Sequence, residues 1–384
     1  MKTLTAYTHE IDNVEAAVAE ILEQLNLEET LCKNSVGIIS CYPEFLDSGV
    51  VEALCEALPF DVLGATTLAV GSAGEYGFTM LSLMVMTGDD VSFSAMLSDD
   101  ILQEQEKPIQ EMCKKALADI KDEAKMIMLY APIISHIGSE IIVNIMDSVC
   151  GGIPIFGTLA SDHTDDYQQT QAIYNGKGYQ GQIAILVIGG NVDPQFSIMS
   201  IPEEKVLRQK AIVTESSGNV LVSVNDMSVI EYLRTIGLVA EDTSIEGVLA
   251  IPVMVDFSND TEPIAIALLI NEDGTASSGS QVPKGASLSV GTIIGDDVAN
   301  ATKDVVKQIL DCKNNSGVIM YSCLSRMLVL GVDAEAELAK IGAGLSAEIP
   351  YTLSYSGGEI CPVKDKDGKF VNSVHNFSLI SCVF

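Results

Sequence analysis

The sequence GVIMYSC at residues 317–323 is a short apolar run that ends in small and polar residues. Such a run is typical of a strand that is buried on both faces of a sheet. A predicted helix over Asp333–Leu345 follows, then the proline-led strand YTLSYSGGE and the strand NFSLISCVF. The order strand, helix, strand, strand predicts an α/β unit, and small or polar residues follow its first two strands.

The same order occurs twice earlier in the chain. One unit starts at VGIISC (36–41) and continues through a helix near Val50–Leu58 and the proline-led strand FDVLGATT. Another starts at MIMLYAP (126–132) and continues through a helix near Glu140–Val149 and the proline-led strand IFGTLASD. Because local identity is low, the pattern fits either a true duplication or a chance similarity. In both cases the pattern predicts an α/β fold of the mixed α+β kind, in which helices cover mixed sheets.

Residues 192–292 interrupt this order with a more antiparallel pattern. The segment contains a predicted helix over Asp226–Ile236 and predicted strands over 247–256, 263–270 and 275–281. We therefore expect an insert of different architecture between the second unit, which starts at residue 126, and the third unit, which starts at residue 317.

The charge of the chain excludes several classes of partner. Its 384 residues contain 21 Lys and Arg against 53 Asp and Glu, which gives a formal net charge of −32. Such a field repels nucleic-acid phosphates and anionic membrane surfaces. The apolar runs are also much shorter than the ~20 residues of a spanning helix. We expect neither nucleic-acid binding nor membrane insertion.

Cysteine usage indicates a reduced compartment. The nine cysteines form no C-x-x-C pair, and several lie inside apolar runs. We interpret them as core thiols of a cytoplasmic protein, and the first 30 residues lack the order of a signal peptide. No P-loop and no dinucleotide fingerprint is present, so no cofactor is expected.

Arg326 is the first candidate for a binding role, because it follows a predicted buried strand in a very acidic chain. A guanidinium presents a rigid fork that suits a carboxylate. It could therefore clamp a ligand carboxylate, or it could form an internal ion pair with one of the many acids.

Cys323 lies three residues before Arg326, and a nearby guanidinium could activate its thiol. His375 is the best candidate base for a catalytic Cys323–His375 pair. The alternative interpretation of Cys323 is a small buried hydrophobic side chain.

Glu359 follows the glycine pair Gly357-Gly358, which permits a close backbone approach. Its carboxylate could accept a hydrogen bond from a ligand ammonium, or it could be a solvated acid after a turn. The loop Asp162–Asp166 carries metal-type ligands, but it has no second cluster, so a polar loop is preferred and no metal site is expected.

The chain resembles the FIST proteins, which carry FIST N and FIST C domains, over residues 30–384. The order and spacing of several motifs carry this resemblance rather than any single motif. Those resembling FIST N are 60–67 (FDVLGATT), 81–91 (LSLMVMTGDDV), 156–162 (FGTLASD) and 174–176 (YNG); those resembling FIST C are 213–220 (VTESSGNV), 225–226 (ND), 322–326 (SCLSR), 355–362 (YSGGEICP) and 375–376 (HN).

This resemblance implies an N-terminal helix and lead-in over 1–29, a FIST N-like domain over 30–222 and a FIST C-like domain over 223–384. It also implies an intracellular sensor of a small molecule, with amino acids as the proposed ligand class. No output domain accompanies it, so a separate signalling protein or homo-oligomerisation would carry the signal.

The leading hypothesis is thus a sensor whose pocket holds a ligand carboxylate at Arg326 and an ammonium at Glu359. Two alternatives remain open: an enzyme that acts on acyl or amide bonds through Cys323, and an interaction scaffold without a small ligand. The expected site residues are Arg326, Glu359, Asp162, Gly357, Gly358, Ser356, Cys323 and Asn376.

Overall fold

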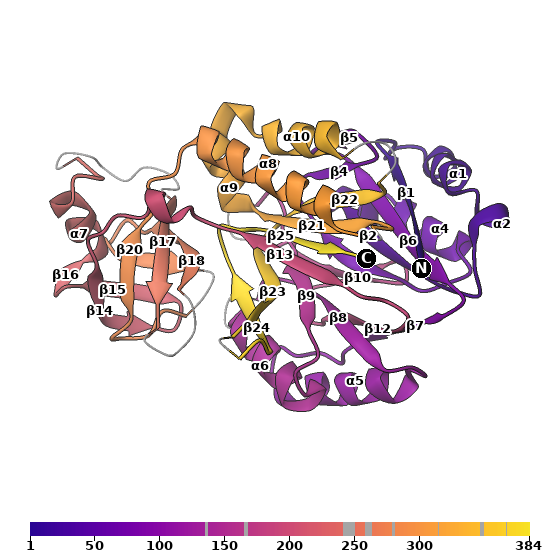
Figure 1. Cartoon of the computed structure of the whole chain (residues 1–384), viewed down its shortest axis with the longest axis horizontal. Helices are drawn as coiled ribbons and strands as arrows, with labels where there is room; N and C mark the ends of the chain where they lie inside the picture. Colours follow the sequence, from indigo (N-terminus) through magenta and orange to yellow (C-terminus); the bar gives the residue numbers. More distant parts are fainter. Residues whose placement is uncertain are drawn as a thin grey trace.

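The computed structural model describes residues 1–134, 137–164, 168–240, 250–257, 263–278, 281–313, 315–345, 349–365 and 367–384. Within these residues the chain forms three six-stranded mixed sheets and one seven-stranded antiparallel sheet. Figure 1 shows the seven-stranded sheet as a lobe at the left of the view, beside a larger body that contains the other sheets.

Unit one contains β1 (Lys2–Thr8), α1 (Val14–Leu25), α2 (Leu27–Thr30), β2 (Asn34–Cys41), α3 (Glu44–Asp47), α4 (Val50–Ala57), β3 (Val62–Thr66), β4 (Val70–Ser72), β5 (Glu75–Gly77) and β6 (Leu81–Gly88). β2 and β3 pair in parallel, β6 pairs antiparallel with β2, and β1 pairs antiparallel with β6. α1 begins at Val14, because the Asn13 side chain caps it by accepting from the Ala16 amide.

Unit two repeats this arrangement with β7 (Val91–Leu97), α5 (Glu106–Asp119), β8 (Ala124–Ala131), α6 (Ser139–Cys150), β9 (Ile155–Leu159), β10 (Ala172–Tyr174), β11 (Lys177–Tyr179) and β12 (Ala184–Gly190). β8 and β9 pair in parallel, β12 pairs with β8, and β7 pairs with β12. Each unit is thus strand, helix, strand, helix, strand, hairpin, strand.

Unit three contains β13 (Gln195–Met199), α8 (Gly295–Asp311), β21 (Val318–Cys323), α9 (Leu324–Leu330), α10 (Ala336–Gly344), β22 (Tyr351–Ser356), β23 (Gly358–Lys364), β24 (Phe370–His375) and β25 (Leu379–Val383). β21 and β22 pair in parallel, β25 pairs with β21, and β13 pairs with β25. The predicted repeat is confirmed at the level of topology. β13, which the sequence analysis placed in the insert, belongs to this unit.

The units exchange their hairpins. The hairpin β4–β5 of unit one pairs with β22 of unit three, β10–β11 of unit two pairs with β3 of unit one, and β23–β24 of unit three pairs with β9 of unit two. Each of the three six-stranded sheets is therefore completed by a hairpin from another unit, and the exchange closes in a ring.

The insert is a closed antiparallel sheet between β13 and α8. It consists of β14 (Ala211–Ser217), β15 (Val220–Val224), β16 (Met227–Ser228), α7 (Val229–Thr235), β17 (Ala250–Asp256), β18 (Ile264–Ile270), β19 (Ala276–Ser278) and β20 (Ser287–Val290). A pairing between β14 and β15 closes it into a barrel with its own apolar core. The antiparallel prediction is confirmed. Parts of the strands predicted at 247–256 and 275–281 lie outside the described residues.

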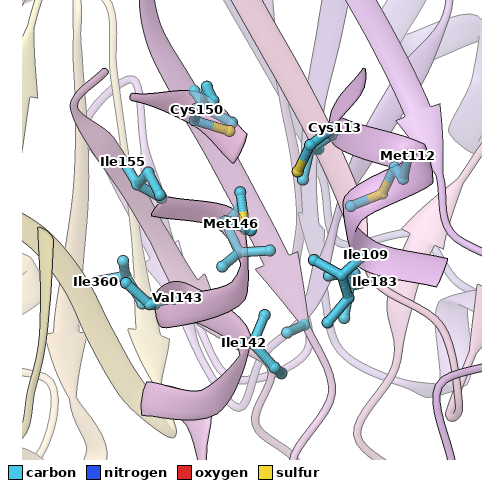
Figure 2. Packing of buried hydrophobic residues seen from close by; sticks show 14 of the residues in the cluster. Ile109, Met112, Cys113, Ile142, Val143, Met146, Cys150, Ile155, Ile183 and Ile360 are labelled. Carbon is cyan, nitrogen blue, oxygen red and sulfur yellow. The ribbon is translucent and has the colours of Figure 1, made fainter. Parts of the chain in front are cut away.

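Apolar side chains divide the body into an inner core and three outer cores. The inner core contains Met84, Met128 and Tyr321, one from each unit, so the sheets face one another there. The outer face of each sheet packs against a helix pair, α1–α4, α5–α6 or α8–α10. Figure 2 shows the second of these, with Met112 and Cys113 of α5 facing Met146 and Cys150 of α6. Burial on both strand faces explains the continuous apolar runs in the sequence.

The hairpin exchange predicts how the chain responds to division. Residues 1–200 produced alone lack β23–β24, which complete the sheet of unit two, and leave β4–β5 without a partner. Because β9 and the hairpin β4–β5 then have exposed strand edges, we expect this fragment to lack cooperative unfolding or to self-associate. Co-expression with residues 201–384 should restore a soluble 1:1 complex. Circular dichroism measures the cooperativity of unfolding, and size-exclusion chromatography measures self-association and complex formation. A monomeric 1–200 fragment that unfolds cooperatively would contradict the prediction.

Candidate functional site

A cavity of about 550 Å³ lies where the strand ends of units two and three meet the barrel. Its first wall is the segment between β8 and α6 with the start of α6, which contributes Ile133, Ile134, Ile137, Ser139 and Ile142. The barrel forms a second wall with Asn219, Ala267, Leu269, Ser277, Ser278 and Gln281. Unit three supplies a third with Cys323, Leu324, Ser325, Leu328, Ser356 and Asn376.

Four of the residues predicted from the sequence line this cavity: Cys323, Ser356, Gly357 and Asn376. They meet because β21 ends at Cys323 and its parallel neighbour β22 ends at Ser356, directly opposite in the register. Ligand sites in α/β folds gather at such strand ends. The sequence pattern therefore locates this part of the cavity.

Gly357 allows the backbone of unit three to approach unit two closely. A Cβ atom at this position would lie 2.5 Å from Ile133 Cδ1 and 2.8 Å from the Ala160 carbonyl oxygen. The Gly357 amide donates to the Leu159 carbonyl at 3.0 Å. The close approach predicted for this glycine is therefore made to the chain's own backbone. Gly358 lies at the start of β23, where its amide donates to Ser356 Oγ at 3.1 Å.

Arg326 is fully buried beside the cavity wall and makes an internal ion pair with Glu337. Its Nη2 atom donates to Glu337 Oε1 at 2.6 Å and its Nε atom to the same oxygen at 3.2 Å. Burial alone would raise the pKa of Glu337, but the charge of Arg326 and the hydrogen bonds from Arg326, Ser322 and Thr302 hold it below its usual value. The clamp on a ligand carboxylate stays a prediction, since Arg326 is not among the residues that line the cavity.

Glu359 lies behind the same wall with no exposed surface. Its Oε2 atom accepts from Ser378 Oγ at 2.7 Å, whereas Oε1 has no hydrogen-bond partner among the described residues. Burial raises the pKa of Glu359 to about 8, although the Ser378 hydrogen bonds and the charge of Arg326 act in the opposite direction. The structure thus brings Arg326 and Glu359 into one electrostatic cluster, as the sensor hypothesis required, but in the wall and not at the cavity surface.

The geometry gives Cys323 little nucleophilic character. Burial, with the nearby Glu359 carboxyl, raises the pKa of its thiol to about 12, so the protonated form dominates at neutral pH. His375 Nε2 lies 3.1 Å from the Cys361 carbonyl oxygen, and burial lowers the pKa of this imidazole to about 4. No hydrogen bond between Cys323 and His375 occurs among the described contacts. The catalytic pair stays an untested alternative.

Asp162 organises a loop outside the cavity lining. Its Oδ1 atom accepts from the Thr164 amide at 2.7 Å, and its Oδ2 atom accepts from the Gln169 amide at 2.6 Å. A ligand contact of Asp162 also stays a prediction. Asp165 and Asp166, which completed the metal-type sequence, lie outside the described residues. Among the residues the structure does describe, no group of three or more metal-type side chains occurs.

Sequence reasoning missed the first and second walls. A signal existed for the first wall, because Pro132 and Ile133 directly follow the apolar strand MIMLYA of unit two. Asn219 lies in the motif at 213–220 that resembles FIST C, whereas no comparable signal marks the barrel residues Ser278 and Gln281. They reach the cavity only through the packing of the barrel on the body, where the Asn376 amide donates to the Ala265 carbonyl at 3.2 Å.

The Arg326–Glu337 pair should be structural. Arg326→Met should lower the free energy of unfolding by about 3–5 kcal/mol, because it leaves the Glu337 carboxylate buried and unpaired. Combining Arg326→Met with Glu337→Leu should recover most of this loss, since neither charge then remains buried. Urea titrations measure both variants, and equal stability of Arg326→Met and the unsubstituted protein would refute the assignment.

Glu359 should make the fold less stable as the pH rises. With a folded-state pKa of about 8 against an ordinary 4.5, the folded protein keeps a proton that the unfolded chain releases between these values. The stabilisation is complete below pH 4.5 and is lost as the pH approaches 8. Glu359→Gln should abolish this dependence, with a gain at pH 8 of at most about 5 kcal/mol. Urea titrations across this range, with the exposed Glu335→Gln as control, provide the measurement; parallel pH profiles for both variants would contradict it.

Comparisons with known proteins place the chain in a family. Residues 35–227 match the family model of the FIST N domain, and residues 230–362 match that of the FIST C domain. FIST domains are generally sensory domains that bind small ligands. A comparison with curated proteins gives no significant match.

Among solved structures, the chain is similar to a cyanuric acid hydrolase from A. caulinodans. The sequence identity is 10%, the TM-score is 0.37, and the alignment covers 100% of this chain and 98% of the other.

Among the described helices, none combines the length and the apolar character needed to cross a membrane. The two domain matches together span most of the chain, and the protein therefore belongs to the FIST family.

Proposed function

We propose that this protein is a sensor that binds a small molecule in the cavity between the barrel and units two and three. The observation that carries the proposal is the composition of the cavity walls, which come from the barrel and from two units of the body. The cavity volume of about 550 Å³ falls in the range of ~300–1,000 Å³ that is common for ligand pockets.

A ligand in this position would contact both FIST domains, because the first wall lies in the FIST N match and the other two lie largely in the FIST C match. Binding there would favour the arrangement in which the walls lie together. A sensor requires such a preference, since a ligand shifts a conformational equilibrium only when it binds one conformation of the protein more tightly than the other.

The resemblance implies an amino acid or a similar carboxylate as ligand, and we retain that class as a hypothesis. A separate signalling protein would receive the output, or the chain would signal through homo-oligomerisation. A cytoplasmic location fits nine cysteines that are all free.

Narrowing the cavity should abolish ligand binding. Leu328 lines the cavity and is 53% exposed, so Leu328→Trp should reduce the cavity without destabilising the core. Leu310, which is 51% exposed on α8 and outside the lining, provides the matched control Leu310→Trp. In a thermal-shift screen of a small-molecule library that includes amino acids, we expect hits that Leu328→Trp removes and Leu310→Trp keeps.

Two results would count against the proposed function. One is a library in which no compound shifts the melting temperature of the unsubstituted protein. The other is a set of hits whose shifts survive in Leu328→Trp, since those compounds would then bind elsewhere.

A further inference from the structure

The cavity walls are unusual in their charge. Among the described residues that line the cavity, none is Asp, Glu, Lys, Arg or His. The polar groups are hydroxyls and amides, such as Ser139, Ser356, Asn219 and Gln281. A carboxylate or ammonium ion buried there would lose its hydration without gaining an opposite charge from a lining residue, which is strongly unfavourable.

The nearest buried cation, Arg326, does not offset the cost of burying a charged ligand in the cavity. The Arg326 guanidinium is only 1% exposed and is neutralised by Glu337 at 2.6 Å. At the edge of the cavity, Glu140 Oε1 accepts from the Gln281 amide at 3.3 Å, which adds a negative charge close to the second wall. Together with a net charge of −32, these groups disfavour entry of an anion.

The walls also differ from one another in polarity. The first wall presents a cluster of isoleucines, Ile133, Ile134, Ile137 and Ile142, which offers apolar surface to a hydrocarbon group. The facing barrel wall presents Ser277, Ser278 and Gln281. A ligand that satisfies both walls needs hydrocarbon on one side and neutral hydrogen-bonding groups on the other.

Ser139 provides a specific polar contact. It is 5% exposed and lines the cavity, and its Oγ atom has no hydrogen-bond partner among the described residues. A buried hydroxyl without a partner is unfavourable, and a ligand amide or hydroxyl would relieve this because Ser139 Oγ can donate and accept.

We infer that the ligand is an uncharged molecule that carries amide or hydroxyl groups on one side and a branched or cyclic hydrocarbon on the other, in the manner of a capped amino acid or a cyclic dipeptide. This inference rests on the proposed function for the position of the site, and it replaces the hypothesis of an amino acid or carboxylate ligand with an uncharged class. Free amino acids, which are zwitterions, fall outside the uncharged class.

A matched set of leucine derivatives tests the inference, because its members share one side chain and differ in charge. The set contains leucine as the zwitterion, N-acetyl-leucine as the anion, leucinamide as the cation and N-acetyl-leucinamide as the neutral compound. We expect N-acetyl-leucinamide to bind at least about tenfold more tightly than the charged members in ligand-observed NMR titrations.

Two pairs of variants connect that selectivity to the walls. Ser139→Ala should weaken binding of the neutral compound about threefold to tenfold, because a neutral hydrogen bond is lost. Ser148→Ala on the exposed side of the same helix should not weaken it. Leu328→Lys should improve binding of N-acetyl-leucine by placing a cation at the lining, and Leu310→Lys should leave it unchanged.

The outcomes separate the two proposals. Tightest binding by any of the three charged members, abolished by Leu328→Trp, would overturn the uncharged class and leave the cavity as the sensor site. Binding of the neutral compound that Leu328→Trp does not affect would overturn both. Absence of binding by every member at millimolar concentration would overturn the uncharged, leucine-like class, and the library screen would then decide the sensor site on its own.

Discussion

The exchange of hairpins among the three units is the constraint on which the body of the structure depends. β4–β5, β10–β11 and β23–β24 each leave the unit that encodes them and complete the sheet of another. No unit can therefore satisfy the backbone hydrogen bonds of its own sheet, and partial assembly leaves exposed strand edges. The FIST N and FIST C matches are continuous in sequence, but they share sheets in space.

The repeated topology also makes the differences between units informative. Glu359 pairs with Thr158 at the position where unit one has Val70 and unit two has Ala172 in their own exchanged hairpins. Only the hairpin of unit three thus carries an acid at this position, and unit three is also the unit that contains the barrel. The buried cluster of Arg326, Glu337 and Glu359 accordingly lies behind the wall that faces the barrel, where the symmetry of the body is broken.

The sequence predicted the local elements because their signals are local. Apolar runs marked β2, β8 and β21. It could not predict the hairpin exchange, because β4 and β10 have three residues each and show no periodicity. Nor could it select Glu337 as the partner of Arg326 among 53 acids, since that choice depends on how α9 and α10 pack. The residues predicted for the candidate site reach the cavity at the strand ends of unit three, whereas the first wall after β8 and the barrel wall were missed.

Neutralisation of Arg326 connects the fold to selectivity. A guanidinium left free at the cavity would select carboxylates, but Arg326 is paired with a buried acid. Under the proposal of an uncharged ligand, recognition is left to the hydroxyls, amides and isoleucines of the walls. Such walls discriminate mainly by rejecting charge, because an unpaired ion costs several kcal/mol whereas each neutral hydrogen bond contributes about 1 kcal/mol. A ligand that meets these walls stabilises the contact between barrel and body by its own binding free energy, and that coupling is what a sensor of this geometry can transmit.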